Sequence, residues 1–165
     1  MIVGNGGDDV LMGGEGPNDL SGGDGDDLLR AGAGDGDVHG GAGSDRYAAA
    51  ACCGPLTIDL RAGILSRDGQ TFSFVAIESV TGSPHGDTLL GSPGPDVLVG
   101  WRGDDTIRGR GGDDHLRDGE GEDSAHGGGI DRCVSVEVPT SCEDLRGERR
   151  HAERPASHER LTTAP

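Results

Sequence analysis

One position recurs every nine residues in two long stretches of this chain, and it is aspartate in most copies. Each of these aspartates is the sixth residue of a glycine-rich nonapeptide, as in Gly22-Gly-Asp-Gly-Asp-Asp27-Leu-Leu-Arg. Glycine at the first, second and fourth places permits positive φ, so the first six residues can curl into a tight loop that turns backbone carbonyls toward one point. One carboxylate and several carbonyls give an all-oxygen environment, which Ca²⁺ prefers. The spacing therefore predicts rows of calcium-binding loops.

The copies form two arrays that keep their phase. Five copies run from Gly4 to Ala48 and five from Gly82 to His126, and a shortened copy follows around Asp131. This strict phase argues against a flexible acidic linker. The last three residues of each copy predict a short strand with one inward apolar side chain. The predicted inward residues are Leu11, Leu20, Leu29, Val38, Tyr47, Leu89, Leu98, Ile107, Leu116 and Ala125.

The nonapeptide resembles the calcium-binding repeat of the RTX, or hemolysin-type, family. The resemblance implies an all-β fold, a right-handed parallel β-roll (a β-helix solenoid) in which two nonapeptides form one coil. It also implies that Ca²⁺ lies between the loops of successive coils, whose sixth places are 18 residues apart. The implied side-chain ligands are Asp9, Asn18, Asp27, Asp45, Asp87, Asp96, Asp105, Asp114, Asp123 and Asp131. The implied backbone ligands belong to Gly7, Gly25, Gly43, Gly94, Gly103, Gly112 and Gly121.

The roll should carry its ligands on two edges of unequal strength. In the first array Asp9, Asp27 and Asp45 share one edge, whereas the opposite edge has Asn18 and Gly36 at the aspartate place. We expect that weaker edge to bind calcium poorly or not at all. In the second array Asp87, Asp105 and Asp123 share one edge, and Asp96, Asp114 and Asp131 share the other. We expect about five or six ions, most of them in the second array.

Substitutions in the second array depart from the repeat, and three of them are bulky. His85 replaces a fourth-place glycine, which predicts a distorted loop before Asp87. Trp101 and Arg110 occupy second places, where a backbone carbonyl survives any substitution. Those two loops keep their ligating ability if their φ angles are accessible.

Four segments follow from the composition. Residues 1–48 form the first array, 49–81 a β spacer without calcium loops, 82–145 the second array with its cysteine-containing end, and 146–165 a polar tail predicted to be disordered. Alternating residues such as Leu56-Thr-Ile58 predict strands in the spacer. We interpret the spacer as further coils of the same stack; the alternative is a separate hairpin unit between two independent rolls.

The net charge of −16 fits cation binding and argues against a nucleic-acid partner. The chain contains no apolar run long enough for a transmembrane helix. It also lacks the metalloprotease, nucleophile-elbow and phosphate-loop motifs, so we do not expect an enzyme.

We expect an extracellular, secreted protein whose export route stays open, because Met1 leads directly into the first repeat without a signal peptide. The start thus suggests either a fragment or another route of export. Two alternative functions are an accessory module of a larger secreted toxin, protease or lipase, and a structural or adhesive surface protein that binds carbohydrate or its own copies. Disulfides among Cys52, Cys53, Cys133 and Cys142 allow three connectivities.

Overall fold

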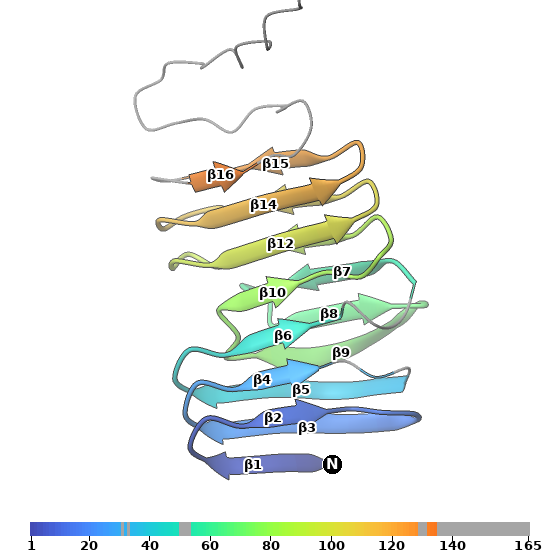
Figure 1. Ribbon diagram of the computed structural model, residues 1–165, viewed down its shortest axis with the longest axis vertical. Coiled ribbons are helices and arrows are strands. Elements are labelled where there is room, and N and C mark those ends of the chain that lie inside the picture. The colour runs from blue at the N-terminus through green and yellow to red at the C-terminus, as the bar shows by residue number, and fades with distance from the viewer. Residues whose placement is uncertain (31, 33, 50–53, 129–131, 135–165) are drawn as a thin grey trace, which may run out of the picture.

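The computed structural model describes residues 1–30, 32, 34–49, 54–128 and 132–134, and within them the chain forms β-strands without a helix (Figure 1). The strands wind into a parallel β-solenoid of about seven turns, which confirms the expected fold class. One sheet has seven strands, in the order β16 (Arg132–Val134), β14 (His115–Glu120), β12 (Val97–Arg102), β10 (Ser79–Thr81), β6 (Arg46–Ala48), β4 (Leu28–Arg30) and β2 (Val10–Met12).

The second sheet has nine strands and forms the opposite wall of the solenoid. Its order is β1 (Ile2–Gly6), β3 (Pro17–Asp24), β5 (Gly34–Ala42), β9 (Gln70–Val75), β8 (Ile64–Arg67), β7 (Leu56–Asp59), β11 (Thr88–Leu90), β13 (Thr106–Arg108) and β15 (Ser124–His126).

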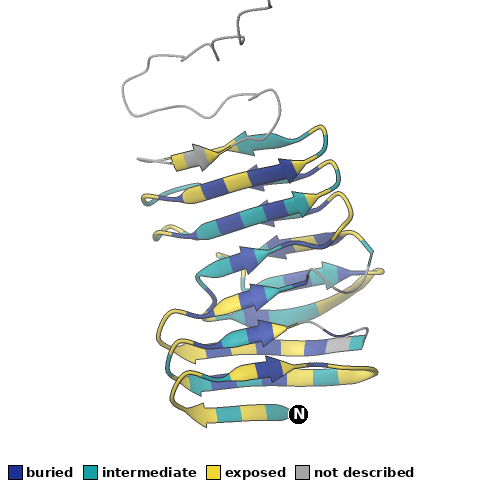
Figure 2. Ribbon diagram, viewed as in Figure 1, coloured by how far each residue is buried: buried dark blue, intermediate teal, exposed yellow. Residues whose placement is uncertain are grey.

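The nine-residue period sets the register of the arrays. Because two copies make one coil, most strands within an array pair in parallel with the strand 18 residues later, so that Leu11 pairs with Leu29 and Leu29 with Tyr47. Equivalent residues of successive coils therefore stack directly. The inward side chains of both sheets form one buried cluster, and the buried positions along the strands are dark blue in Figure 2.

The core consists of the residues that the eighth place predicted. Of the ten predicted inward residues, all but Ala125 are buried, and Ala125 is half-buried against the same cluster. The spacer adds Phe74, Ile58 and Leu65 to this core. Tyr47 and Phe74 pack edge to face, with ring centroids 5.0 Å apart.

The spacer lies in the same stack, but it is not built of coils alone. β7, β8 and β9 form an antiparallel meander within the nine-stranded sheet. In the seven-stranded sheet β6 pairs directly with β10, the one strand that the described part of the spacer adds to this sheet. The prediction of simple coils was wrong here, because Gly63 and the Asp68-Gly69 pair turn the chain back on itself.

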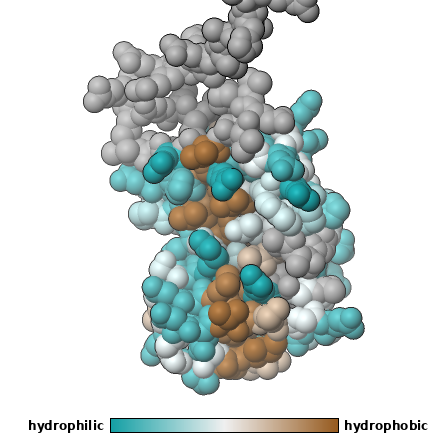
Figure 3. All heavy atoms as spheres, in the orientation of Figure 1, coloured by the Kyte–Doolittle hydropathy of each residue, from teal (hydrophilic) through white to brown (hydrophobic). Residues whose placement is uncertain are grey.

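Exposed apolar side chains gather at the N-terminal end of the solenoid. Val3 on β1 and Val10 and Met12 on β2 are exposed, and an apolar patch covers this end of the face shown in Figure 3. None of the described elements is a helix of the length and hydropathy that crossing a membrane requires. The predicted disordered tail at residues 146–165 lies outside the described residues, as do Cys52, Cys53, Asp131, Cys142 and the side chain of Cys133.

Close stacking of the loops accounts for glycine at the fourth place. Gly25 has φ of +133°, and a Cβ atom built on it would lie 2.5 Å from the carbonyl oxygen of Gly7 in the preceding coil. A side chain there must push two coils apart. The turn glycine Gly69 also has positive φ, at +75°, but nothing lies within 4 Å of its Cβ position.

We therefore expect Gly25→Ala to destabilise the calcium-loaded protein more than Gly69→Ala. Both variants carry backbone strain of about 1–3 kcal/mol, but only Gly25→Ala adds a clash with backbone. Thermal unfolding followed by circular dichroism would measure both changes. Equal losses of stability in the two variants would contradict the close approach.

Candidate calcium sites

A ladder of carboxylates runs along each edge of the solenoid. The Oδ1 atom of a sixth-place aspartate accepts a hydrogen bond from the backbone amide of the sixth-place residue one coil earlier. Asp9 N donates to Asp27 at 2.8 Å and Asp27 N donates to Asp45 at 2.8 Å. The same bond, at 2.7–2.9 Å, links Asp87 to Asp105, Asp96 to Asp114, and Asp105 to Asp123.

The loops before Asp9, Asp27, Asp45, Asp105, Asp114 and Asp123 share one backbone conformation. Their second and fourth places have positive φ even where the second residue is not glycine, as for Asn5 at +85°, Trp101 at +87° and Arg110 at +77°. Side chains seldom adopt this region, so the surrounding stack must hold these residues in it. Trp101 and Arg110 thus preserve the loop conformation, as the sequence analysis required.

In several of these loops the second carboxylate oxygen lacks a hydrogen-bond partner among the described residues. The Oδ2 atoms of Asp9, Asp27, Asp45 and Asp105 are shielded from water and accept no hydrogen bond among the described residues. A buried carboxylate oxygen in this state is costly unless a cation or a donor meets it. The first-place glycine leaves space at this atom, since a Cβ on Gly4 would lie 2.5 Å from Asp9 Oδ2. These loops therefore fit a cation that binds oxygen.

A family model described as the RTX calcium-binding nonapeptide repeat matches the chain in four copies, over residues 3–38, 12–47, 81–116 and 108–129. The matches cover both arrays and more than half of the chain. The chain belongs to the RTX calcium-binding repeat family. No curated protein matches it. RTX repeats bind Ca²⁺, which supplies two positive charges to the loop oxygens when it is bound.

The oxygen atoms available to a cation in the RTX loops belong to both backbone carbonyls and aspartate side chains. No group of three or more His, Cys, Asp or Glu side chains converges as a metal site in the part of the chain that the structure describes. Each loop instead contributes one sixth-place carboxylate beside stacked backbone, which is the donor set expected for a calcium site made largely of carbonyls.

In two RTX loops of the second array, a serine of the loop donates hydrogen bonds to both carboxylate oxygens of the sixth-place aspartate. Ser83 N donates to Asp87 Oδ2 at 2.6 Å, and Ser83 Oγ donates to Asp87 Oδ1 at 2.9 Å. Ser92 makes the equivalent bonds to Asp96, at 2.6 Å from its amide and 3.2 Å from its hydroxyl. Neither loop has positive φ at its second or fourth place. The distortion predicted from His85 is therefore present, but the Gly-Ser-Pro sequence accounts for it in both loops.

Asn18 satisfies its loop in another way. Its side-chain nitrogen donates to the backbone carbonyls of Gly13, of Glu15 at 3.4 Å and of Gly16 at 3.1 Å. In this orientation an amide N–H group, and not an amide oxygen, faces the loop carbonyls. The weaker edge expected at Asn18 and Gly36 thus has a physical basis, because a neutral donor occupies the position where a cation would meet these carbonyls.

Glu78 extends the carboxylate ladder through the spacer, which the sequence analysis missed. Asp45 N donates to Glu78 Oε2 at 2.9 Å, across 33 residues of sequence. Val97 N donates to the backbone oxygen of Glu78 at 2.9 Å, so Glu78 lies one coil before Asp96. The available signal was its phase, because Glu78 stands nine residues before Asp87.

Fifth-place aspartates form a separate, exposed row of hydrogen bonds between coils, in which donor and acceptor coils are reversed relative to the sixth-place ladder. Asp26 N donates to Asp8 Oδ1 at 2.9 Å, and Glu122 N donates to Asp104 Oδ1 at 2.9 Å. These carboxylates therefore accept from the following coil, whereas the sixth-place aspartates accept from the preceding one. Their exposure leaves them outside the buried row of oxygens.

Arg110 forms a salt bridge at the junction of the spacer and the second array. Its guanidinium makes a two-pronged ion pair with both oxygens of Asp59, at 2.7 Å each, and a bond of 2.9 Å to the carbonyl of Gly91. This hydrogen-bonded pair lowers the pKa of Asp59. The guanidinium thus ties the loop that precedes β14 to the end of β7.

Burial raises the pKa of carboxyl groups in the sixth-place ladder, in contrast to the lowered pKa of Asp59. Burial, together with the neighbouring charges of Asp87, Asp123 and Asp104, raises the pKa of Asp105 to about 7. Burial also raises the pKa of Asp45. Carboxylates in this state repel one another when they are ionised, and a divalent cation between them removes the penalty.

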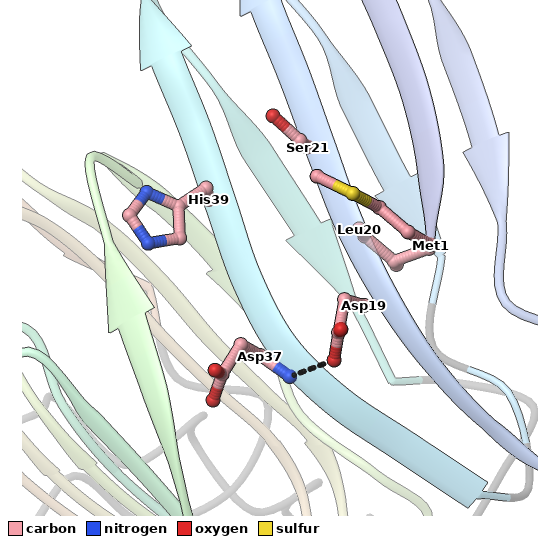
Figure 4. Close-up of a pocket in the computed structure, with 6 residues that line it drawn as sticks. All are labelled: Met1, Asp19, Leu20, Ser21, Asp37 and His39. Atoms are coloured by element: carbon pink, nitrogen blue, oxygen red, sulfur yellow. Dashed lines mark hydrogen bonds between the residues drawn. The ribbon is translucent and has the colours of Figure 1, made fainter.

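The structure also has a hollow on the outer face of β3 and β5, lined by Met1, Asp19, Leu20, Ser21, Asp37 and His39 (Figure 4). Asp37 N donates to Asp19 Oδ1 at 3.0 Å, and Asp37 Oδ1 in turn accepts from Ser73 N at 2.8 Å. These seventh-place carboxylates accept hydrogen bonds from the strand that follows in the stack, as the fifth-place carboxylates do.

We expect Asp105→Ala to lower the number of bound calcium ions by at least one, and Asp104→Ala to leave that number unchanged. Asp105 carries the buried Oδ2 atom, whereas Asp104 is exposed and loses only a surface bond from Glu122, worth about 1 kcal/mol. Isothermal titration calorimetry gives both stoichiometries. An unchanged count in Asp105→Ala would exclude this aspartate as a ligand.

Without calcium, the folded solenoid should be more stable in mild acid than in mild alkali. The folded state keeps a proton on Asp105, whose pKa is raised from 3.8 to about 7, and the unfolded chain releases it. The resulting stabilisation is complete below the unfolded pKa and is lost as the pH rises through the folded pKa. Circular dichroism in a chelator would measure it, as a larger β signal at about pH 6 than at about pH 8.

Asp105→Asn is the matched control, because it cannot titrate and should shrink the difference between the two pH values. A wild-type stability that rises with pH in the chelator would contradict this account.

Proposed function

We propose that calcium drives the folding of this RTX solenoid, and that the protein works outside the cell, where calcium is plentiful. The observation that carries this proposal is the set of buried, unpartnered Oδ2 atoms of Asp9, Asp27, Asp45 and Asp105. In the arrays the apolar core contains about one buried side chain per nonapeptide, so the stacked loops make much of the contact between coils. Their carboxylates oppose that contact until a cation joins them.

The magnitude of the effect is sufficient for a folding switch. Extracellular calcium modules bind with dissociation constants of about 10⁻⁴ to 10⁻³ M. In calcium at about ten times the dissociation constant, which is about millimolar for the tighter of these sites, an ion that binds only the folded state stabilises that state by about 1.4 kcal/mol per site. Several such sites together reach the stability of a typical domain, about 5–15 kcal/mol.

The geometry also supports a distribution of ions across both arrays. The first array has three of the unpartnered oxygens, on Asp9, Asp27 and Asp45. Asp87 and Asp96 already accept bonds from serines on both oxygens, so we propose that their loops contribute less to calcium binding than the other loops of the second array. Asp114 and Asp123 occupy the regular positions in the ladder and complete the proposed ligands there.

Circular dichroism with calcium, with magnesium and with a chelator tests the proposal. We expect a β signal that rises with millimolar calcium, reverses on chelation and responds weakly to magnesium, which demands a tighter octahedral set of ligands. Sedimentation velocity should show compaction under the same conditions. A spectrum and a sedimentation coefficient that are the same in calcium and in excess chelator would overturn calcium-driven folding.

A further inference from the structure

The middle of the solenoid differs from both arrays in how its loop carboxylates are held. We propose that residues 54–99 form a metal-independent unit that stays folded when calcium is removed, and that the calcium-binding coils assemble on it from both sides. This inference rests on the proposed calcium-driven folding of the arrays and divides the chain into a part that needs the ion and a part that does not.

The first argument is that both loop aspartates of this unit are satisfied by protein atoms. Asp87 accepts three hydrogen bonds of 2.6–2.9 Å, two from Ser83 and one from the backbone amide of Leu56. Asp96 accepts two from Ser92, at 2.6 and 3.2 Å. Neither carboxylate has an unpartnered buried oxygen, in contrast to Asp45 and Asp105 on either side. These loops therefore close without a cation.

Proline prepares the same two loops for their folded conformation. Pro84 follows Ser83, while Pro93 and Pro95 lie in the loop of Asp96. Each proline fixes its own φ and restricts the residue before it, so the unfolded chain has less freedom to lose. The glycine-rich loops of the arrays have the opposite property, because glycine loses the most freedom on ordering.

Local pairing is the second distinguishing feature. The hairpin of β8 and β9 closes through Asp68 and Gly69, whose φ angles of +49° and +75° suit a tight two-residue turn. β7 and β8 form a second antiparallel pair. These antiparallel contacts join residues 3–11 apart and cost little loop-closure entropy, whereas the parallel pairings within the arrays join residues 17 or 18 apart.

The unit also has a denser core than the arrays. The arrays bury about one apolar side chain per nine residues, whereas the hairpin strands and their neighbours bury larger and more closely spaced ones. The buried apolar residues of the unit are Leu56, Ile58, Leu65, Phe74, Ile77, Val80, Leu89 and Leu98. More apolar area per ordered residue shifts the balance toward folding without metal.

Hydrogen exchange of the full chain, read by mass spectrometry in calcium and in excess chelator, tests the inference. In calcium we expect protection throughout the strands. In chelator we expect protection to persist in β7, β8, β9 and β11, while β2 to β4 and β13 to β15 exchange at the rate of an unfolded chain, at least a hundredfold faster than in calcium.

Two other outcomes separate this inference from the proposed function. Arrays that lose protection in chelator together with residues 54–99 would overturn the metal-independent unit and leave calcium-driven folding intact. Exchange that is unaffected by chelation anywhere in the chain would overturn calcium-driven folding itself, and with it this division of the chain.

The double variant Ser83→Ala and Ser92→Ala supplies a positive test. Loss of hydroxyl bonds to charged acceptors should accelerate exchange of residues 54–99 in chelator about tenfold. Ser44→Ala is the matched control, because Ser44 is exposed in a regular loop and bonds Asp26 through its backbone amide. Unchanged exchange in the double variant would overturn the role of the serines, and the single Ser92→Ala variant gives the same comparison if the double variant fails to fold in calcium.

Discussion

Carboxylates stacked one coil above another, with little positive charge beside them, are the constraint on which this solenoid depends. Each sixth-place aspartate binds the backbone of its neighbour through one oxygen and turns the other into a buried space. That arrangement fixes the register of the coils, yet it concentrates like charges along an edge of a chain with net charge −16. A divalent ion bound between these carboxylates would offset the repulsion that the stacked arrangement creates.

The arrays could be predicted from sequence because their physics is periodic. The phase of Asp27 and Asp45 gives the ladder, and the apolar eighth place gives the core column that includes Leu29 and Tyr47. A coil of 18 residues then follows from the family resemblance. None of this needs long-range information, since every contact repeats a contact made one coil earlier.

The departures could not be predicted in the same way, because each depends on which atom of a side chain faces the loop. Sequence alone could not tell that Asn18 presents its nitrogen to the carbonyls, or that Ser83 turns toward Asp87. The antiparallel meander was also beyond reach, since alternating residues predict strands without their direction. Glu78 is different: its nine-residue phase was visible, and only the change from aspartate to glutamate concealed it.

Stacked loops also impose a neighbour rule on the chain. A Cβ on second-place Gly119 would lie against the backbone of Trp101 one coil below, and one on Gly128 against that of Arg110. The two bulky second-place residues, Trp101 and Arg110, themselves stand above the serine loops, whose backbone departs from the shared conformation. Whether a second place accepts a side chain therefore depends on the backbone of the loop 18 residues earlier. A substitution at one second place thus changes which residues are sterically possible at the same place in the next coil.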